Sequence, residues 1–278
     1  MRHVMCFFLV LASAIAVTGA AFAFTRTAAR FDGGATPRVL STDCTLNSAN
    51  LCAGWIWVFN DVEGAVWGTV LDPDECNFYG GIPGVADILV YSRCSTTPGR
   101  IDNVAISKVD AVGCRTALLY QSGPITMVHC VAGDRWTSIV PGRFPGVGFE
   151  PFAVTVTWGP QSGGVNNPQL ASDNGIANLY CQQTGAYPAF PGCATSTTSC
   201  VGWRIPPQRT FIYVTDINGD GSLDDFCALY GRPYPLAFPY LAPYGYLPNN
   251  LILSVGIDSW GGTPVQPTTW GHVKSLFD

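Results

Sequence analysis

Two glycines and five Asp or Asn side chains fall within ten positions of the segment TDINGDGSLDDF, residues 215–226. Calcium takes about six to eight oxygen ligands, which loops supply from alternating positions. Asp216, Asn218 and Asp220 hold positions one, three and five of such a loop, and Gly221 permits the sharp turn after them. Carboxylates confined to so short a loop repel one another unless a cation compensates them. The sequence therefore predicts calcium as the cofactor, with these ligand residues: Asp216, Asn218, Asp220, Ser222, Asp224 and Asp225.

This pattern resembles the D-x-[DN]-x-D-G calcium loops of EF-hand, dockerin and FG-GAP (integrin-propeller) repeats. The resemblance covers about ten residues of 278, so it implies a cation and not a family. Cys227 stands where an EF-hand has its bidentate Glu, and the preceding RTFIYV has the composition of a strand, which is closer to FG-GAP loops, although no second copy is found. An ordinary Asn-Gly or Asp-Gly turn between two strands is the alternative. Extracellular calcium modules bind at about 10⁻⁴–10⁻³ M, so we expect a structural ion rather than a sensor.

Residue types suited to catalysis are few. Beyond the N-terminal segment the histidines are His129 and His272, and no G-x-S-x-G, H-E-x-x-H or Gly-Lys phosphate-loop motif occurs. A glycoside hydrolase needs two carboxyl groups about 5–9.5 Å apart, and Glu150, in GVGFEPF, is the candidate for one of them. The sequence assigns no catalytic residue and favours a non-catalytic protein.

A Tyr- and Pro-rich segment, GRPYPLAFPYLAPYGYLPNN (231–250), has the composition of a binding surface. Proline stiffens the backbone and limits the entropy lost on binding, and exposed aromatic rings stack on sugars or anchor protein partners. The alternative is that the segment wraps the domain and buries its rings. The candidate ligand-binding residues are Tyr234, Phe238, Tyr240, Tyr244 and Tyr246.

The first 23 residues read as a secretory signal peptide, with an apolar run and an A-x-A cleavage site ending at Ala23. Only 12% of residues are charged, the net charge is −5, and basic clusters are absent from the sequence, which argues against nucleic acid as a partner. No later segment has the roughly 18 consecutive apolar residues of a membrane span. We therefore expect export to the cell surface or the medium, without membrane insertion after the signal is removed.

The cysteines point to the same destination. Ten remain after the signal segment, and an even number in an exported chain indicates disulfides, here five. Pairing cannot be read from sequence; the working hypothesis joins near neighbours as 44–52, 76–94, 114–130 and 193–200, which leaves 181–227. The cysteines concerned are Cys44, Cys52, Cys76, Cys94, Cys114, Cys130, Cys181, Cys193, Cys200 and Cys227.

Short apolar runs separated by Gly, Pro, Asn and Ser predict an all-β protein, specifically a β-sandwich of jelly-roll type. FAVTVTW (152–158) is the clearest strand, because Phe and Val alternate with Ala and Thr. We expect a flexible leader over 24–43, one domain over 44–262 with long loops at 159–177 and 184–209, and a tail over 263–278 that forms a short helix or a docked chain end. The remaining predicted strands are 54–59, 66–70, 86–92, 100–107, 116–121, 125–130, 135–140, 178–183, 210–215 and 251–257.

Three functions fit these features. The first is a non-catalytic extracellular module that binds a glycan or a protein. The second is a matrix or surface subunit that self-associates through sheet edges, which low charge permits. The third is a polysaccharide-acting hydrolase that uses Glu150 with a second acid.

Overall fold

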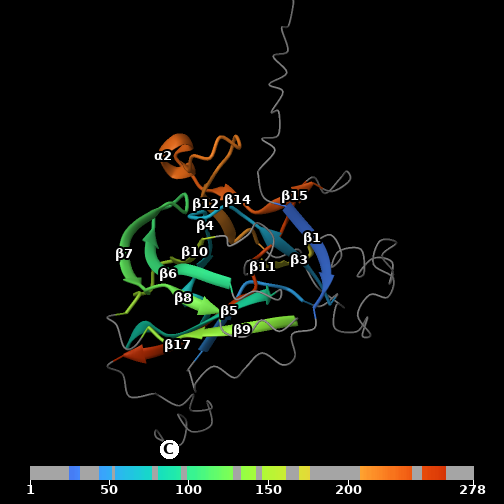
Figure 1. Cartoon of the computed structure of the whole chain (residues 1–278). Coiled ribbons are helices and arrows are strands. Elements are labelled where there is room, and N and C mark those ends of the chain that lie inside the picture. The colour runs from blue at the N-terminus through green and yellow to red at the C-terminus, as the bar shows by residue number, and fades with distance from the viewer. Residues whose placement is uncertain are drawn as a thin grey trace, which may run out of the picture.

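The structure, a computed structural model, describes residues 25–31, 44–51, 54–76, 81–94, 99–127, 133–141, 146–160, 169–175, 207–239 and 246–260 (Figure 1). The described chain consists mostly of β-strands in antiparallel sheets, as the sequence predicts. Its helices are the single turn η1 (Pro73–Cys76) and the short α2 (Phe226–Tyr230). None of the helices in this part of the chain is long and apolar enough to cross a membrane.

Two large sheets and one small one account for the strands. The first sheet has the order β1 (Thr25–Arg30), β3 (Trp55–Asn60), β11 (Gln169–Asp173), β5 (Ile82–Cys94), β17 (Leu253–Trp260), β2 (Cys44–Asn47), with β9 (Gly133–Ile139) also paired to β5. The second sheet has the order β13 (Asp224–Asp225), β12 (Thr210–Thr215), β4 (Val66–Leu71), β10 (Phe152–Trp158), β6 (Gly99–Val109), β7 (Arg115–Gln121), with β14 (Tyr234–Pro235) paired to β12 and β8 (Ile125–Met127) paired to β6. The small sheet joins β15 (Ala237–Pro239) to β16 (Tyr246–Pro248).

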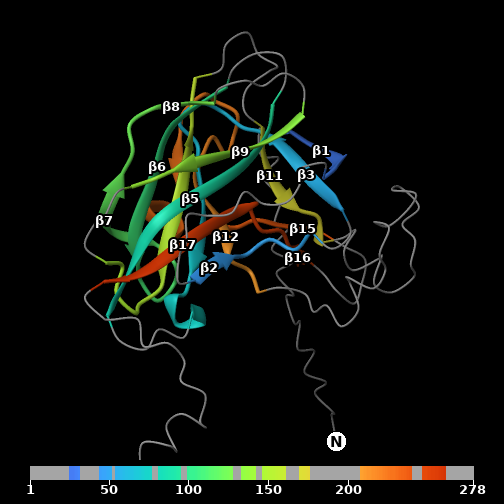
Figure 2. The ribbon, with the colours of Figure 1, turned by 90° about the horizontal axis from the view of Figure 1, so that it is seen from below.

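The two large sheets share one hydrophobic core. On β10 the side chains of Phe152, Val154 and Val156 enter it, because successive side chains of a strand point to opposite faces. The ring of Phe59, on the first sheet, lies 5.1 Å from that of Trp67, on the second. Both rings are fully buried, so contact between them joins the sheets directly. Figure 2 shows strands of both sheets, among them β5 and β17 of the first and β6 and β12 of the second. Burial of aromatic side chains is among the largest single sources of stability in such a core.

Four of the strand pairs enclose one another in sequence order, so that the outermost strands of the set pair together and the innermost strands pair together. In the first sheet β2 pairs with β17 and β5 with β11. In the second sheet β4 pairs with β12 and β6 with β10. Early strands therefore pair with late ones, and the described fold depends on contacts between segments that are distant in sequence.

Two segments differ from the sequence-based expectations. Residues 25–30 form β1, paired along its whole length with β3, so this part of the expected flexible leader belongs to a sheet. The expected long loop 159–177 contains β11, which pairs with both β3 and β5. These segments are polar or rich in small residues, and neighbouring strands rather than intrinsic propensity make them strands. The predicted strand 178–183, the loop 184–209 up to residue 206 and the tail 263–278 lie outside the described residues.

Two disulfides are present in the described residues, and neither matches the near-neighbour hypothesis. Cys44 bonds to Cys76, which ties β2 to η1. Cys114 bonds to Cys227, which ties the turn between β6 and β7 to α2 over a separation of 113 positions. The pairings 44–52, 76–94, 114–130 and 181–227 are therefore wrong, because sheet register and not sequence distance brings the sulfurs together. Disulfides of this kind are typical of oxidising compartments.

Candidate functional site

The acidic loop follows β12 and is organised around Asp216, which is only 4% exposed. Its Oδ1 accepts hydrogen bonds from the backbone N–H groups of Gly219 (2.7 Å) and Asp220 (3.2 Å), and its Oδ2 accepts one from Gly221 (2.8 Å). Both glycines have positive φ, 74° and 87°, a region that favours glycine. Asp216 therefore holds the loop in a closed turn.

The tip of the loop is exposed and internally bonded. The amide of Asn218 donates to Asp220 Oδ2 (3.0 Å) and accepts from the Asp220 N–H (3.0 Å). Asp220 Oδ1 accepts from both the hydroxyl and the N–H of Ser222. These hydrogen bonds, that of the Ser222 hydroxyl foremost, lower the pKa of Asp220.

The last two acidic residues lead into α2. Asp224 Oδ2 accepts from the N–H of Ile217 (3.3 Å), which closes the loop on itself. Asp225 is the N-cap of α2 and accepts from the N–H of Ala228 (3.1 Å), as Asp commonly does at this position. Four of the six residues predicted as calcium ligands thus lie in the loop itself, and Asp224 and Asp225 form β13 at its end, where Asp225 also caps α2.

The side chains of the loop offer oxygen atoms as metal ligands, and oxygen is the ligand type that calcium prefers. In the described residues, however, no three or more His, Cys, Asp or Glu side chains are gathered as a metal site. The carboxylates of the loop accept backbone and side-chain hydrogen bonds instead. In this arrangement the carboxylate oxygens of Asp216, Asp220 and Asp224 accept hydrogen bonds from the loop itself.

A buried carboxylate lies beside the loop. Asp61, in the connection between β3 and β4, is 2% exposed and accepts from the indole N–H of Trp67 and from the hydroxyl of Thr215 (3.1 Å). Burial raises the pKa of Asp61 to about 6; hydrogen bonds oppose the shift, and the charge of Asp216 adds to it. The acidic loop is therefore electrostatically coupled to a group in contact with the core.

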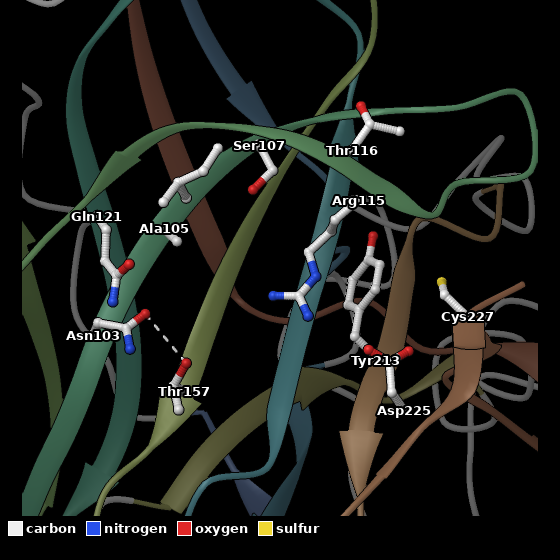
Figure 3. Close-up of a pocket in the computed structure, with 11 residues that line it drawn as sticks. Asn103, Ala105, Ser107, Arg115, Thr116, Gln121, Thr157, Tyr213, Asp225 and Cys227 are labelled. Atoms are coloured by element: carbon white, nitrogen blue, oxygen red, sulfur yellow. Dashed lines mark hydrogen bonds between the residues drawn. The ribbon is translucent and has the colours of Figure 1, made fainter. Parts of the chain in front are cut away.

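A second candidate site is a hollow of about 350 Å³ on the outer face of the second sheet (Figure 3). Its side chains come from β6, β7, β10, β12 and β13, and from α2. Ala105, which is 5% exposed, lies at the base of the hollow, and its small side chain leaves space that polar side chains surround. The side chains that line the hollow include Asn103, Ser107, Arg115, Leu118, Gln121 and Thr157.

Arg115 is held at one side of this hollow. Its guanidinium carbon lies 4.9 Å from the centre of the Tyr213 ring, a cation–π contact. The buried Tyr213 hydroxyl donates to the carbonyl of Gly113 (3.1 Å), and burial, foremost, raises its pKa. The adjacent disulfide Cys114–Cys227 fixes the same corner. In Figure 3 the guanidinium points into the hollow, across from Asn103 and Thr157, which share a hydrogen bond of 3.2 Å.

The sequence alone does not predict this hollow, although part of the pattern that forms it is present in the predicted strands. The predicted strands 100–107 and 152–158 each carry a polar or small face opposite the apolar one. Asn103, Ala105 and Ser107 form that face on β6, and Thr157 continues it on β10. The alternation showed which side chains face outward, but only the sheet order places β6 between β10 and β7 and thus assembles a site.

The Tyr/Pro segment divides between core and surface. Phe238 is 8% exposed, stacks on Phe59 (5.9 Å) and is covered by Arg26, so it serves the core and is removed from the ligand-facing candidates. Tyr234 is half-buried against Phe226 (5.4 Å), and burial raises its pKa. Tyr246 is 66% exposed. Tyr240 and Tyr244 lie outside the described residues.

Glu150, the candidate catalytic carboxylate, forms a salt bridge at the protein surface. Glu150 is 76% exposed and pairs with Lys108 (2.9 Å). It borders a wider crevice of about 630 Å³ in which Glu75 is likewise paired, to Arg209. Both glutamates therefore have cationic partners. His129 and His272 lie outside the described residues.

Comparison with known proteins adds no relative: no family model, no curated protein and no solved structure matches this chain. The function must be inferred from the chain's own residues. Of the two candidate sites, the acidic loop has its carboxylates bonded internally, whereas the hollow presents side chains outward. The hollow is the better candidate for a ligand.

Proposed function

We propose that this protein is an exported, non-catalytic module that binds a glycan or an extracellular protein, stabilised by disulfides and calcium. The observation that carries the proposal is the polar hollow on the outer face of the second sheet. Sheet faces of soluble proteins that do not cover a core are usually flat and solvated. A concave one lined by amides, hydroxyls and a guanidinium is suited to hydrogen-bonding recognition.

A glycan fits the hollow better than a protein side chain. Its volume is at the small end of the roughly 300–1,000 Å³ range of small-molecule sites. Sugar hydroxyls both donate and accept, and the amides of Asn103 and Gln121 and the hydroxyl of Ser107 do the same. Leu118, which is 59% exposed, supplies an apolar wall for the C–H face of a ring.

We also infer a jelly-roll type of β-sandwich, an architecture common among sugar-binding domains. The nested pairs β2–β17, β4–β12, β5–β11 and β6–β10 support it, as does the order of the first sheet. The second sheet departs from the regular jelly-roll order. Its pairs β4–β12 and β6–β10 are joined through β4 and β10, whereas a regular jelly roll would join them through β12 and β6.

Calcium would act as a structural ion in the acidic loop. Asp216 already gathers three backbone N–H groups, and Asp220 and Asp224 stand in the same turn. The loop leads into α2, which the disulfide Cys114–Cys227 joins to the corner of the hollow. An ordered loop would therefore help to fix the position of Arg115. The exposed Tyr246 remains a candidate for a second contact with a long ligand.

The first experiment is a pull-down of the mature protein on insoluble polysaccharides and cell-envelope material, with calcium and with chelator. Depletion by one polymer supports the proposal, and its loss in the variant Asn103→Ala with Gln121→Ala assigns it to the hollow. The matched control is Asn47→Ala with Gln169→Ala, which changes the same residue types on the first sheet, outside both the hollow and the acidic loop. Absence of depletion, together with concentration-dependent assembly in size exclusion, would instead identify a self-associating matrix subunit. Release of reducing ends that Glu150→Gln abolishes would identify a hydrolase.

A further inference from the structure

We propose that the hollow recognises a sugar that carries a carboxylate, a uronic acid, with Arg115 as the group that binds the acid. This inference rests on the proposed function and narrows it to a ligand class. The observation behind it is a cation that points into a polar hollow in an otherwise acidic, charge-poor protein.

Arg115 differs from its basic neighbours in the described structure. Arg100, Lys108 and Arg209 each lie in a salt bridge, with Asp102, Glu150 and Glu75 respectively. Within the same described residues no carboxylate lies at salt-bridge distance from Arg115, whose guanidinium rests on the Tyr213 ring instead. A guanidinium presents paired N–H donors that match the two oxygens of a carboxylate, and stacking on a ring holds the plane in position.

The other lining groups suit the rest of a sugar ring. Asn103 accepts from Thr157 through its Oδ1, which fixes the amide on the floor of the hollow. Ser107 on β6, and Gln121 on β7, which pairs with Ala105, line the same space with a hydroxyl and an amide. These neutral groups are suited to ring hydroxyls rather than to further charge.

The charge balance limits the ligand to few negative charges. Asp225 also lines the hollow, although its Oδ1 is occupied by the N–H of Ala228. One guanidinium beside one carboxylate does not provide the cluster of cations that a polyphosphate or nucleic acid requires. One carboxylate on each sugar unit, with neutral hydroxyls around it, matches what the lining offers.

The test uses short probes in isothermal titration calorimetry with the mature protein. The charged probes are trigalacturonate and a hyaluronan tetrasaccharide, and the neutral probes are methyl-esterified trigalacturonate and cellotetraose. Short oligomers at a fixed, saturating calcium concentration limit calcium bridging between ligand and loop. We expect a charged probe to bind, its methyl ester to bind about tenfold or more weakly, and added salt to weaken the charged probe alone.

Two variants locate the effect. Asn103→Asp keeps the oxygen that accepts from Thr157 but adds a negative charge to the hollow, so folding should be retained and the charged probe should bind roughly tenfold to hundredfold more weakly. Arg115→Lys keeps the positive charge but removes the paired N–H donors of the guanidinium, so it should weaken binding as well. The control is Arg232→Gln, which removes an exposed cation outside the hollow and should leave binding unchanged. Thermal unfolding of each variant confirms that it is folded.

The outcomes separate this inference from the function on which it rests. Equal binding of trigalacturonate and its methyl ester, or undiminished binding by Asn103→Asp, would overturn the carboxylate inference and leave a glycan-binding module standing. Inorganic sulfate that binds as tightly as the charged sugars would show an anion site and also overturn it. A protein that binds neither sugars nor any material in the pull-down would overturn both.

Discussion

The hydroxyl of Thr215 donates to the carboxylate of Asp61 (3.1 Å), and this contact joins the end of β12 to the connection between β3 and β4. Thr215 immediately precedes the acidic loop, whereas Asp61 accepts from the indole of Trp67 inside the core. The negative charge of Asp216, the residue after Thr215, helps to raise the pKa of Asp61. The state of the acidic loop and the stability of the core should therefore be linked, which makes thermal unfolding a suitable readout of cation binding.

Calcium should raise the melting temperature, and the loop should be responsible. With a dissociation constant of about 10⁻⁴–10⁻³ M, about 10 mM calcium would add roughly 1.4–2.7 kcal/mol to the free energy of unfolding. The double variant Asp216→Ala with Asp220→Ala should lose most of this rise. Thermal unfolding with calcium and with chelator measures both.

The control for this experiment removes two carboxylates of the surface, Asp74 and Glu150, by substitution with Ala. Both are exposed and lie outside the loop. The control changes the net charge by the same amount and should respond to calcium as the wild type does. If the loop variant responds to calcium as fully as this control, the loop does not hold the ion.

A buried carboxylate should make the protein less stable as pH rises from about 4 to about 7. Burial raises the pKa of Asp173 to about 7, although backbone N–H groups of Asn50 (2.8 Å) and Asn250 (2.7 Å) favour its charged form. The folded state therefore keeps a proton that the unfolded chain releases near its ordinary pKa of 3.8. The penalty is absent below that value, grows through the interval, and is complete above the folded pKa.

The variant Asp173→Asn isolates this effect. Each unit of pKa difference corresponds to about 1.4 kcal/mol, so the wild type should lose on the order of a few kcal/mol relative to the variant over this interval. Urea unfolding at several pH values measures the difference. A wild-type-minus-variant difference that stays flat from pH 4 to pH 8 would contradict the assignment to Asp173.

The local parts of the fold could be predicted from the sequence, and the long-range parts could not. β10 and β12 match the predicted ranges 152–158 and 210–215 because the alternation of apolar and polar residues is contained within each strand. β1, β2 and β11 were missed because TRTAAR, CTLN and QLASD have weak β-propensity of their own. Their strand conformation comes from pairing with β3, β17 and β5, which no local window contains.

The candidate sites divide in the same way. The acidic loop was predictable because its residues are contiguous, from Asp216 to Asp225. The hollow combines Asn103, Arg115 and Thr157, which only the order β10-β6-β7 brings together. The pairing of Cys114 with Cys227 depends on the same long-range arrangement.

Removal of the disulfide Cys114–Cys227 should cost more stability than removal of Cys44–Cys76. The first closes a separation of 113 residues and the second one of 32. The chain-entropy estimate gives about 1 kcal/mol more for the longer loop, on a total of about 4–5 kcal/mol. Double Cys→Ser variants, compared by guanidinium unfolding, test the order, and a non-reducing peptide map of the wild type should contain both linked pairs. Equal losses, or a map with 114–130 linked, would contradict the structure.

The last prediction concerns Gly68 in the middle of β4. A Cβ at this position would lie 2.5 Å from Cγ2 of Thr155 and 2.8 Å from the carbonyl oxygen of Val154, because β10 packs closely against β4. Gly68→Ala should therefore destabilise the protein by about 1–3 kcal/mol, since the backbone of β10 must shift.

The control is Gly123→Ala, where a Cβ would meet nothing within 4 Å. It should leave stability unchanged or raise it slightly, because alanine restricts the unfolded chain. Urea unfolding of both variants provides the comparison. Because β10 also carries Thr157, a shift of its backbone in Gly68→Ala should disturb the floor of the hollow and weaken any ligand found there, whereas Gly123→Ala should not. If Gly68→Ala were as stable as Gly123→Ala, β4 and β10 could not be packed at this register.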